Sequence, residues 1–152
     1  MYQLKKKQFV KATLEECWDF FSSPKNLKEI TPSHMGFDIK VELPEKMYEG
    51  MIIEYTVKPL FNIPMTWVTE IKYVHEGKFF VDEQRQGPYK MWHHEHHFKP
   101  VEGGVEMTDI VSYILPLGPL GKLVHPIIVK GKLEEIFEFR RKKVAELFNG
   151  KQ

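Results

Sequence analysis

The chain has 152 residues, enough for one domain with a hydrophobic core, and we expect a single domain over residues 1–152. Lysine and arginine total 22 against 21 aspartate and glutamate residues, so the net charge of +1 provides no field that would attract nucleic acid or an anionic membrane. The one cysteine, Cys17, excludes an internal disulfide, and there is no leader-like segment or membrane-spanning apolar run. These features favour a cytoplasmic protein that does not insert into membranes.

The first 36 residues predict one strand and two short helices. A weak alternation of apolar and charged residues favours a strand over residues 1–11. Thr13 opens a capping-box pattern, Thr-Leu-Glu-Glu, and the apolar residues that follow recur with a helical period up to Phe21. A second short helix is expected to begin at Pro24 and to end near Ile30.

From residue 37 the hydrophobic period changes from helical to alternating, which predicts a β-sheet. The connections, such as residues 59–64 and 87–89, are too short for crossovers, so we expect an antiparallel meander. The remaining residues, up to Phe148, predict one long helix that lies across the sheet, with an early kink at Pro126. The expected strands cover residues 37–43, 51–58, 65–74, 78–85, 90–99 and 105–115.

This order of elements resembles the START-like or helix-grip superfamily, also called SRPBCC. Two segments carry the resemblance: FFSSPKNL at residues 20–27 with ITP at 30–32, and VDEQRQGPY at 81–89 followed by Trp92, His94 and His96. They look like the bacterial ligand-binding, polyketide cyclase-like group. The resemblance implies an α+β fold in which about seven antiparallel strands wrap around a long C-terminal helix and enclose a cavity. Superfamily members bind, carry, cyclise or hydrolyse small molecules, so the fold leaves the activity open.

The segment MWHHEHHFK at residues 91–99 holds four of the seven histidines of the chain. Alternate residues of a strand share one face, so this segment presents two different rows of side chains. One row begins and ends with large aromatic residues and is expected to face the interior: Trp92, His94, His96 and Phe98. The other row is polar and is expected to face solvent: His93, Glu95, His97 and Lys99.

Hairpin geometry extends the inward row to the neighbouring strands. A three-residue loop at residues 87–89 sets Phe80 opposite His96, Asp82 opposite His94 and Gln84 opposite Trp92. A two-residue turn at residues 103–104 sets Phe98 opposite Asp109, His96 opposite Val111 and His94 opposite Tyr113. The predicted ligand-binding residues are therefore Trp67, Phe80, Asp82, Gln84, Trp92, His94, His96, Phe98, Asp109 and Tyr113.

Three roles for this cluster remain open. The side chains can satisfy one another in the core, with Asp82 accepting from His94 and Asp109 accepting from His96. They can instead orient a small hydrophobic or aromatic ligand in the cavity, which is the function we predict. The alternative is an enzyme of the cyclase, dehydratase or hydrolase kind, with His94 as base and Tyr113 as acid or oxyanion donor.

The sequence suggests two further roles, one for the histidines and one for the apolar turn at residues 115–120. His94 and His96 could share a metal ion with Asp82 or Asp109, but an HxH pair is common by chance, so we predict neither a metal nor a cofactor. A protein-interaction role, such as cell-division control, is the third functional prediction, and a homodimer is compatible with it. It would involve the apolar turn at residues 115–120, which could instead close the cavity.

Overall fold

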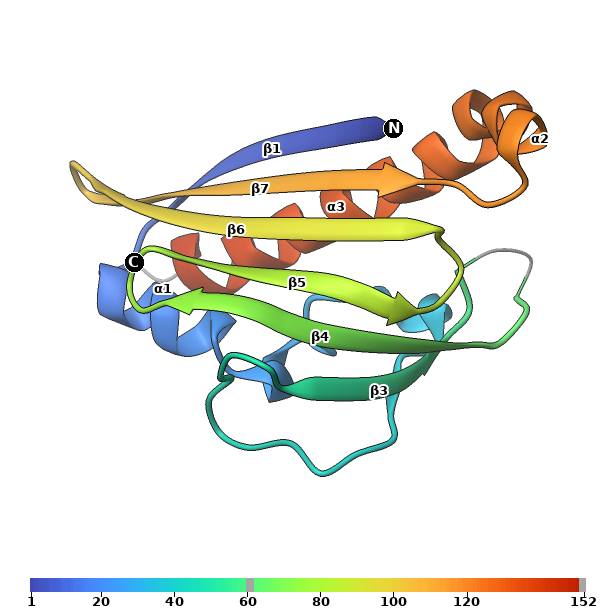
Figure 1. The fold of residues 1–152 in the computed structure, drawn as a ribbon. Helices are drawn as coiled ribbons and strands as arrows, with labels where there is room; N and C mark the ends of the chain where they lie inside the picture. Colours follow the sequence, from blue (N-terminus) through green and yellow to red (C-terminus); the bar gives the residue numbers. More distant parts are fainter. Residues whose placement is uncertain (60–61, 151–152) are drawn as a thin grey trace.

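The structure is a computed structural model that describes residues 1–59 and 62–150, so the centre of the loop predicted at residues 59–64 lies outside the described residues. In the described part, the strands form one antiparallel sheet in the order β1-β7-β6-β5-β4-β3-β2 (Figure 1). The strands are Tyr2–Val10 (β1), Asp38–Ile39 (β2), Ile52–Val57 (β3), Met65–His75 (β4), Phe79–Gln86 (β5), Met91–Val101 (β6) and Gly104–Ile114 (β7). The predicted meander is confirmed, and the histidine-rich strand β6 lies centrally, between β5 and β7.

The second strand is much shorter than predicted. Residues 37–43 were expected to be extended, but only β2, Asp38–Ile39, pairs with β3. Pro44 follows closely and has no N–H to donate to a ladder, and the chain then makes a loop as far as Gly50, whose φ is 84°. The sheet therefore ends in a short edge strand beside this loop, an arrangement that limits edge-to-edge association.

Helix Leu14–Phe21 (α1) begins where the capping pattern predicts, since the Thr13 hydroxyl accepts from the Glu16 amide at 3.1 Å. The second short helix does not extend to Ile30. The chain instead forms two 3₁₀ turns, Pro24–Asn26 (η1) and Ser33–Met35 (η2). Side chains divert the backbone here, because Asn26 donates to the Phe20 carbonyl and the Thr31 hydroxyl donates to the Leu27 carbonyl.

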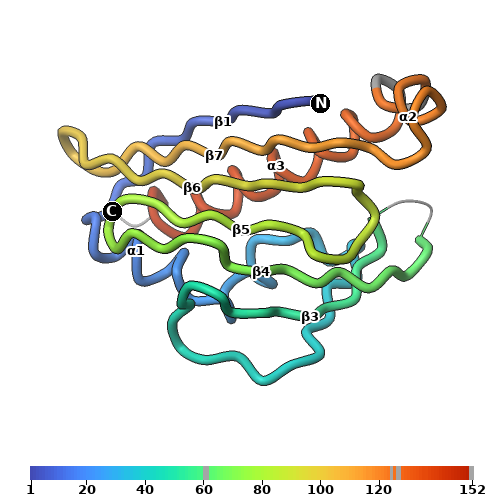
Figure 2. The backbone as a smooth tube through the Cα atoms, viewed as in Figure 1, coloured from blue at the N-terminus to red at the C-terminus, as the bar shows by residue number. Residues whose placement is uncertain are grey.

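The C-terminal helix runs through four consecutive segments. They are Gly118–Val124 (α2), the π-helical turn His125–Val129 (η3), Lys130–Val144 (α3) and the π-helical turn Ala145–Asn149 (η4). The π turn at η3 contains Pro126, the position of the predicted kink, and a proline there cannot donate a helical hydrogen bond. Figures 1 and 2 show α3 running along the face of the sheet that α1 covers at one end. The structure thus has the predicted α+β helix-grip architecture.

The observed pairing of β6 with β7 is shifted by two residues from the predicted register. Its turn consists of Glu102 and Gly103, where Gly103 has a φ of 80°, so Val101 pairs with Gly104. Gly104 already belongs to β7, where β1 passes so close that a Cβ would lie 2.3 Å from the Val10 carbonyl oxygen. A shift of two residues preserves the inward face, since strand side chains alternate with period two. His96 consequently pairs with Asp109, and His94 with Val111.

Two groups of buried side chains fill the space between the sheet and the helices. One group lies around α1 and includes Trp18, Phe21 and Phe80; the other lies under the opposite half of the sheet and includes Trp67 and Trp92. The inward histidines of β6 lie where the two groups meet. His96 stacks on Phe80 with ring centroids 4.0 Å apart, whereas His94 packs edge-on against Trp92 at 6.1 Å.

No helix within the described residues is long and apolar enough to cross a membrane.

Candidate functional site: a pocket between sheet and helix

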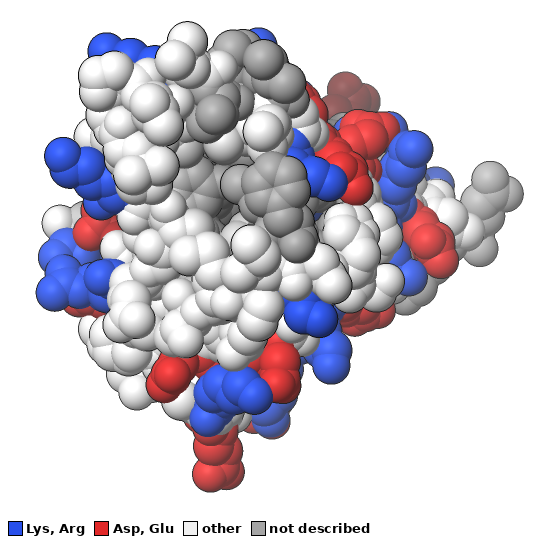
Figure 3. All heavy atoms as spheres, turned by 90° about the vertical axis from the view of Figure 1, so that its right-hand side faces the viewer, with Lys and Arg blue, Asp and Glu red and all other residues white. Residues whose placement is uncertain are grey.

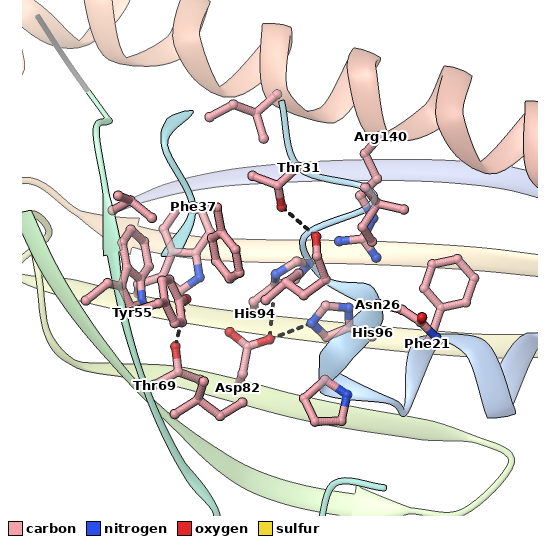
Figure 4. Close-up of a pocket in the computed structure, with 18 of the residues that line it drawn as sticks. Phe21, Asn26, Thr31, Phe37, Tyr55, Thr69, Asp82, His94, His96 and Arg140 are labelled. Atoms are coloured by element: carbon pink, nitrogen blue, oxygen red, sulfur yellow. Dashed lines mark hydrogen bonds and ion pairs between the residues drawn. The ribbon is translucent and has the colours of Figure 1, made fainter. Parts of the chain in front are cut away.

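A pocket of about 190 Å³ lies between the sheet, the segment containing η1 and η2, and helix α3 (Figure 4). Its wall is mostly apolar and contains three tryptophan or tyrosine rings from the sheet, Tyr55, Trp67 and Trp92. Such a wall with a few convergent polar groups is the usual construction of a small-molecule site. An engineered apolar cavity of about 150 Å³ holds benzene, so this pocket is large enough for a small aromatic molecule.

The predicted residues divide between the pocket wall and its surroundings. The wall contains Trp67, Phe80, Asp82, Trp92, His94 and His96. Gln84, Phe98, Asp109 and Tyr113 are not part of it.

Local interactions explain why two of these four side chains lie elsewhere. The Gln84 side chain folds onto its own hairpin, where it donates to the Tyr89 carbonyl at 2.6 Å and accepts from the Tyr89 amide at 3.0 Å. The Tyr113 hydroxyl shares a 2.5 Å hydrogen bond with Nε2 of His125. The predicted acid of the enzymatic alternative is therefore engaged outside the pocket.

Phe98 and Asp109 contribute to the surroundings of the pocket. The Phe98 ring packs edge-on against Trp18 at 5.4 Å and belongs to the core group around α1. Asp109 lies behind the two histidines, where it accepts a hydrogen bond from His94 and lies 3.3 Å from Nδ1 of His96.

Helix α3 contributes residues to the pocket wall that were not predicted from the sequence. This helix supplies Leu133, Ile136, Phe137 and Arg140 to the wall. Arg140 was not among the residues predicted to bind a ligand. The spacing of Leu133, Phe137, Arg140 and Val144 follows an i, i+4, i+7, i+11 pattern, which places Arg140 on the buried stripe of the helix and could have indicated its position.

Two carboxylates, two imidazoles and one guanidinium form the polar part of the site; Figure 4 shows four of these groups, on Asp82, His94, His96 and Arg140, and Asp109 lies outside the pocket wall. His96 Nε2 donates to Asp82 Oδ2 at 2.6 Å, and His94 Nε2 donates to Asp109 Oδ1 at 2.8 Å. This is the reverse of the predicted pairing, because each imidazole reaches the carboxylate diagonal to it rather than the one directly opposite. Arg140 Nη2 lies 3.4 Å from Asp109 Oδ1 and joins the helix to this network.

Burial and charge act in opposite directions on the two carboxyl groups. Burial raises the pKa of Asp109, but the Arg140 guanidinium, the hydrogen bond from His94 and the nearby His96 imidazole hold it well below its usual range. Burial likewise raises the pKa of Asp82, while the bond from His96 and the charge of His94 lower it, with a net shift below the ordinary value. Both groups are therefore carboxylates at neutral pH.

The two imidazoles shift in opposite directions. Burial and the neighbouring His96 lower the pKa of His94. Burial also lowers the pKa of His96, but the two carboxylates outweigh it, so the net shift is upward. Of the two imidazoles, His96 therefore binds an additional proton more readily than His94.

Hydrophobic side chains also collect at the end of the molecule that carries α2. Leu117, Leu120 and Leu123 are 75%, 62% and 70% exposed. Figure 3 views this end and shows a mostly uncharged surface with charged side chains towards its margins. Neither Leu117 nor Leu120 lines the pocket, so the turn predicted at residues 115–120 does not close it.

Comparison with known proteins identifies the fold. No family model matches the sequence, and no curated protein shows a significant match to it. A START superfamily protein from Mycobacterium smegmatis is similar in structure, with a TM-score of 0.70 and 14% identity over 97% of this chain and 99% of that chain. The chain has the helix-grip fold of START-like proteins.

Two further structures support this identification. Protein CV1439 from Chromobacterium violaceum gives a TM-score of 0.71 at 12% identity, covering 96% of each chain. Ara h 8.0201 gives a TM-score of 0.62 at 16% identity, covering 95% of this chain and 98% of that one.

Proposed function

We propose that this protein binds a small hydrophobic or aromatic molecule in the pocket between the sheet and helix α3. The observation that carries the proposal is the composition of the pocket wall, in which aromatic and aliphatic side chains surround one compact polar cluster. The likeness in fold to START-like proteins, a superfamily whose members bind or transform small molecules, supports it.

Polar groups of the wall favour a ligand with at least one hydrogen-bonding end. The Trp67 indole N–H is buried and has no hydrogen-bond partner within the part of the chain that the structure describes. A buried donor without an acceptor costs about 1–3 kcal/mol, and a ligand oxygen placed against it would recover this energy. The Arg140 guanidinium, which also lines the pocket, offers further donors.

Binding without chemistry is the form of the proposal that the site supports best. The enzymatic alternative requires an acid beside the His94 base, and Tyr113, which was assigned that role, is bonded to His125 outside the wall. Tyr55 does line the pocket, but its hydroxyl bonds to Thr69 and burial raises its pKa above the ordinary value, which opposes proton transfer.

Native mass spectrometry of the protein purified from its own host tests the proposal. The expected result is a non-covalent organic adduct in a one-to-one ratio, which denaturation removes. Adding the released compound back to emptied protein should then raise the melting temperature by mass action. At a free ligand concentration of one hundred times the dissociation constant, the free energy of unfolding should increase by about 2.7 kcal/mol. A native mass equal to the bare chain, with no gain in stability from the host's organic extract, contradicts it.

A second candidate, association with another copy of the chain, rests on the exposed leucines of α2. Contiguous exposed apolar surface commonly marks a contact site. Sedimentation velocity should show a dimer for the natural chain and a monomer for Leu120→Glu. Dissociation by Tyr73→Glu, which places the same charge at an exposed position of β4, would contradict this assignment.

A further inference from the structure

We propose that Asp82, His94 and His96 form a binding site for one divalent transition-metal ion at the polar end of the pocket. One potential ligand atom from each residue lies within 4.8 Å of the other two. Two imidazoles and one carboxylate suit Zn²⁺, Fe²⁺ or Co²⁺ rather than Mg²⁺ or Ca²⁺, which prefer oxygen ligands. This departs from the expectation of no metal that the commonness of the HxH pattern suggested, and it does not depend on an organic ligand being present.

The spacing of the three ligand atoms is close to what such an ion requires. Asp82 Oδ2 lies 2.6 Å from His96 Nε2 and 3.8 Å from His94 Nδ1. Neighbouring ligand atoms at bond lengths of about 2.0–2.2 Å in tetrahedral or octahedral geometry are about 2.8–3.6 Å apart. The observed distances lie on either side of this range, so small side-chain rotations bring all three atoms into place. The ion would displace the proton between Asp82 and His96.

Asp109 supplies the carboxylate that commonly lies behind a metal-binding histidine and fixes its orientation. His94 donates through Nε2 to Asp109 at 2.8 Å, and in that tautomer its Nδ1 presents a lone pair towards Asp82. The free nitrogen of His96, Nδ1, lies 3.3 Å from the same Asp109 oxygen but makes no hydrogen bond to any described residue. Each imidazole thus turns one nitrogen towards Asp82 and the other towards Asp109. A carboxylate behind the imidazole is the common way of fixing a metal-binding histidine.

The position of the site leaves room for other ligands on the ion. Asp82 comes from β5 and both histidines come from β6, so the three ligands approach from the sheet alone. All three residues line the pocket, which therefore lies on the open side of the ion. Water or an oxygen atom of a bound molecule can complete the coordination there, as in sites with two histidines and one carboxylate.

The outward row of β6 provides a surface control within the same strand. His93 and His97 lie four residues apart, against two residues for the inward pair, and His93 Nδ1 lies 2.7 Å from Glu83. These side chains are 30% and 39% exposed, against 7% for each inward histidine. Glu95 contacts both of them, but its side chain is about 30% exposed, whereas Asp109 behind the inward pair is buried.

The test is a Co²⁺ titration of the metal-free full chain without a histidine tag, followed by visible absorption and isothermal titration calorimetry. We expect one ion per chain in the natural protein and in a His93→Ala, His97→Ala double variant. Asp82→Asn, which preserves the side-chain shape, should weaken binding at least 100-fold, and Asp109→Asn should weaken it about 10- to 100-fold through orientation of the imidazoles. Far-ultraviolet circular dichroism checks that each variant is folded.

Two results would overturn the proposal. One is the absence of a cobalt absorption band in the natural protein at millimolar Co²⁺. The other is binding that disappears in the His93→Ala, His97→Ala variant, since the ion would then occupy the outer face. Both results come from the natural chain and a surface variant. They can therefore overturn the metal site even if Asp82→Asn does not fold.

Discussion

Replacement of Asp109 by alanine is expected to lower the free energy of unfolding by about 3–5 kcal/mol, the usual cost of breaking a buried ion pair from one side. Asp109 accepts from His94 and lies against Arg140, whose side chain is almost as buried. Without the carboxylate, the Arg140 guanidinium remains buried and loses the negative charge 3.4 Å from it. The low pKa of Asp109 has the same cause, because the folded state favours its charged form.

Urea denaturation of Asp109→Ala measures this effect, and Glu83→Ala is its control. Glu83 makes a contact of similar length with His93, at 2.7 Å, but on the outer face of the sheet. Both side chains there are about 30% exposed, so the loss should stay below about 1 kcal/mol. Equal costs for the two substitutions would show that the buried network contributes no more than a surface pair.

Replacement of Ile136 by tryptophan is expected to block the pocket and to weaken ligand binding more than tenfold, equivalent to about 1.4 kcal/mol or more. Ile136 lines the pocket from α3 and is half-buried, so an indole there can occupy the space without displacing the fully buried core. Isothermal titration calorimetry with 2-naphthol, a small aromatic probe with one hydroxyl, measures the change.

Phe139→Trp is the matched control for this substitution. Phe139 lies on the same helix, is 37% exposed and does not line the pocket, so the variant should bind 2-naphthol as the natural protein does. Melting temperatures should show that both variants are folded. Equal affinities for Ile136→Trp and the natural protein would mean that the probe binds elsewhere.

Much of the fold could be predicted because the hydrophobic pattern and the turn residues act locally. The alternation in residues 91–99 correctly identified the inward face of β6, and the loop at 87–89 set the observed pairing of Asp82 with His94. The predicted β6–β7 register was wrong because Gly103 and Gly104 are consecutive and each suits a turn. Only the close approach of β1 to Gly104 decides between them, and that contact is between segments far apart in the sequence.

The candidate site could be predicted only where it belongs to the sheet. Residues on the inward faces of β5 and β6 follow from alternation, but the part of the wall formed by α3 depends on how the helix is rotated against the sheet. Arg140 was therefore not predicted as a site residue, although it completes the polar cluster. Tyr113 was misplaced as a pocket residue for a related reason, since its hydrogen bond to His125 joins β7 to the π turn before α3.

The most direct test of the account is a titration of ¹⁵N-labelled protein with 2-naphthol, observed at the indole N–H resonances. The three tryptophans provide an internal comparison, because Trp67 and Trp92 line the pocket whereas Trp18 packs in the core group around α1. We predict saturable shifts of the Trp67 and Trp92 signals, largest for Trp67, with the Trp18 signal nearly unchanged. No shift at millimolar probe, or equal shifts of all three signals, would contradict binding in this pocket.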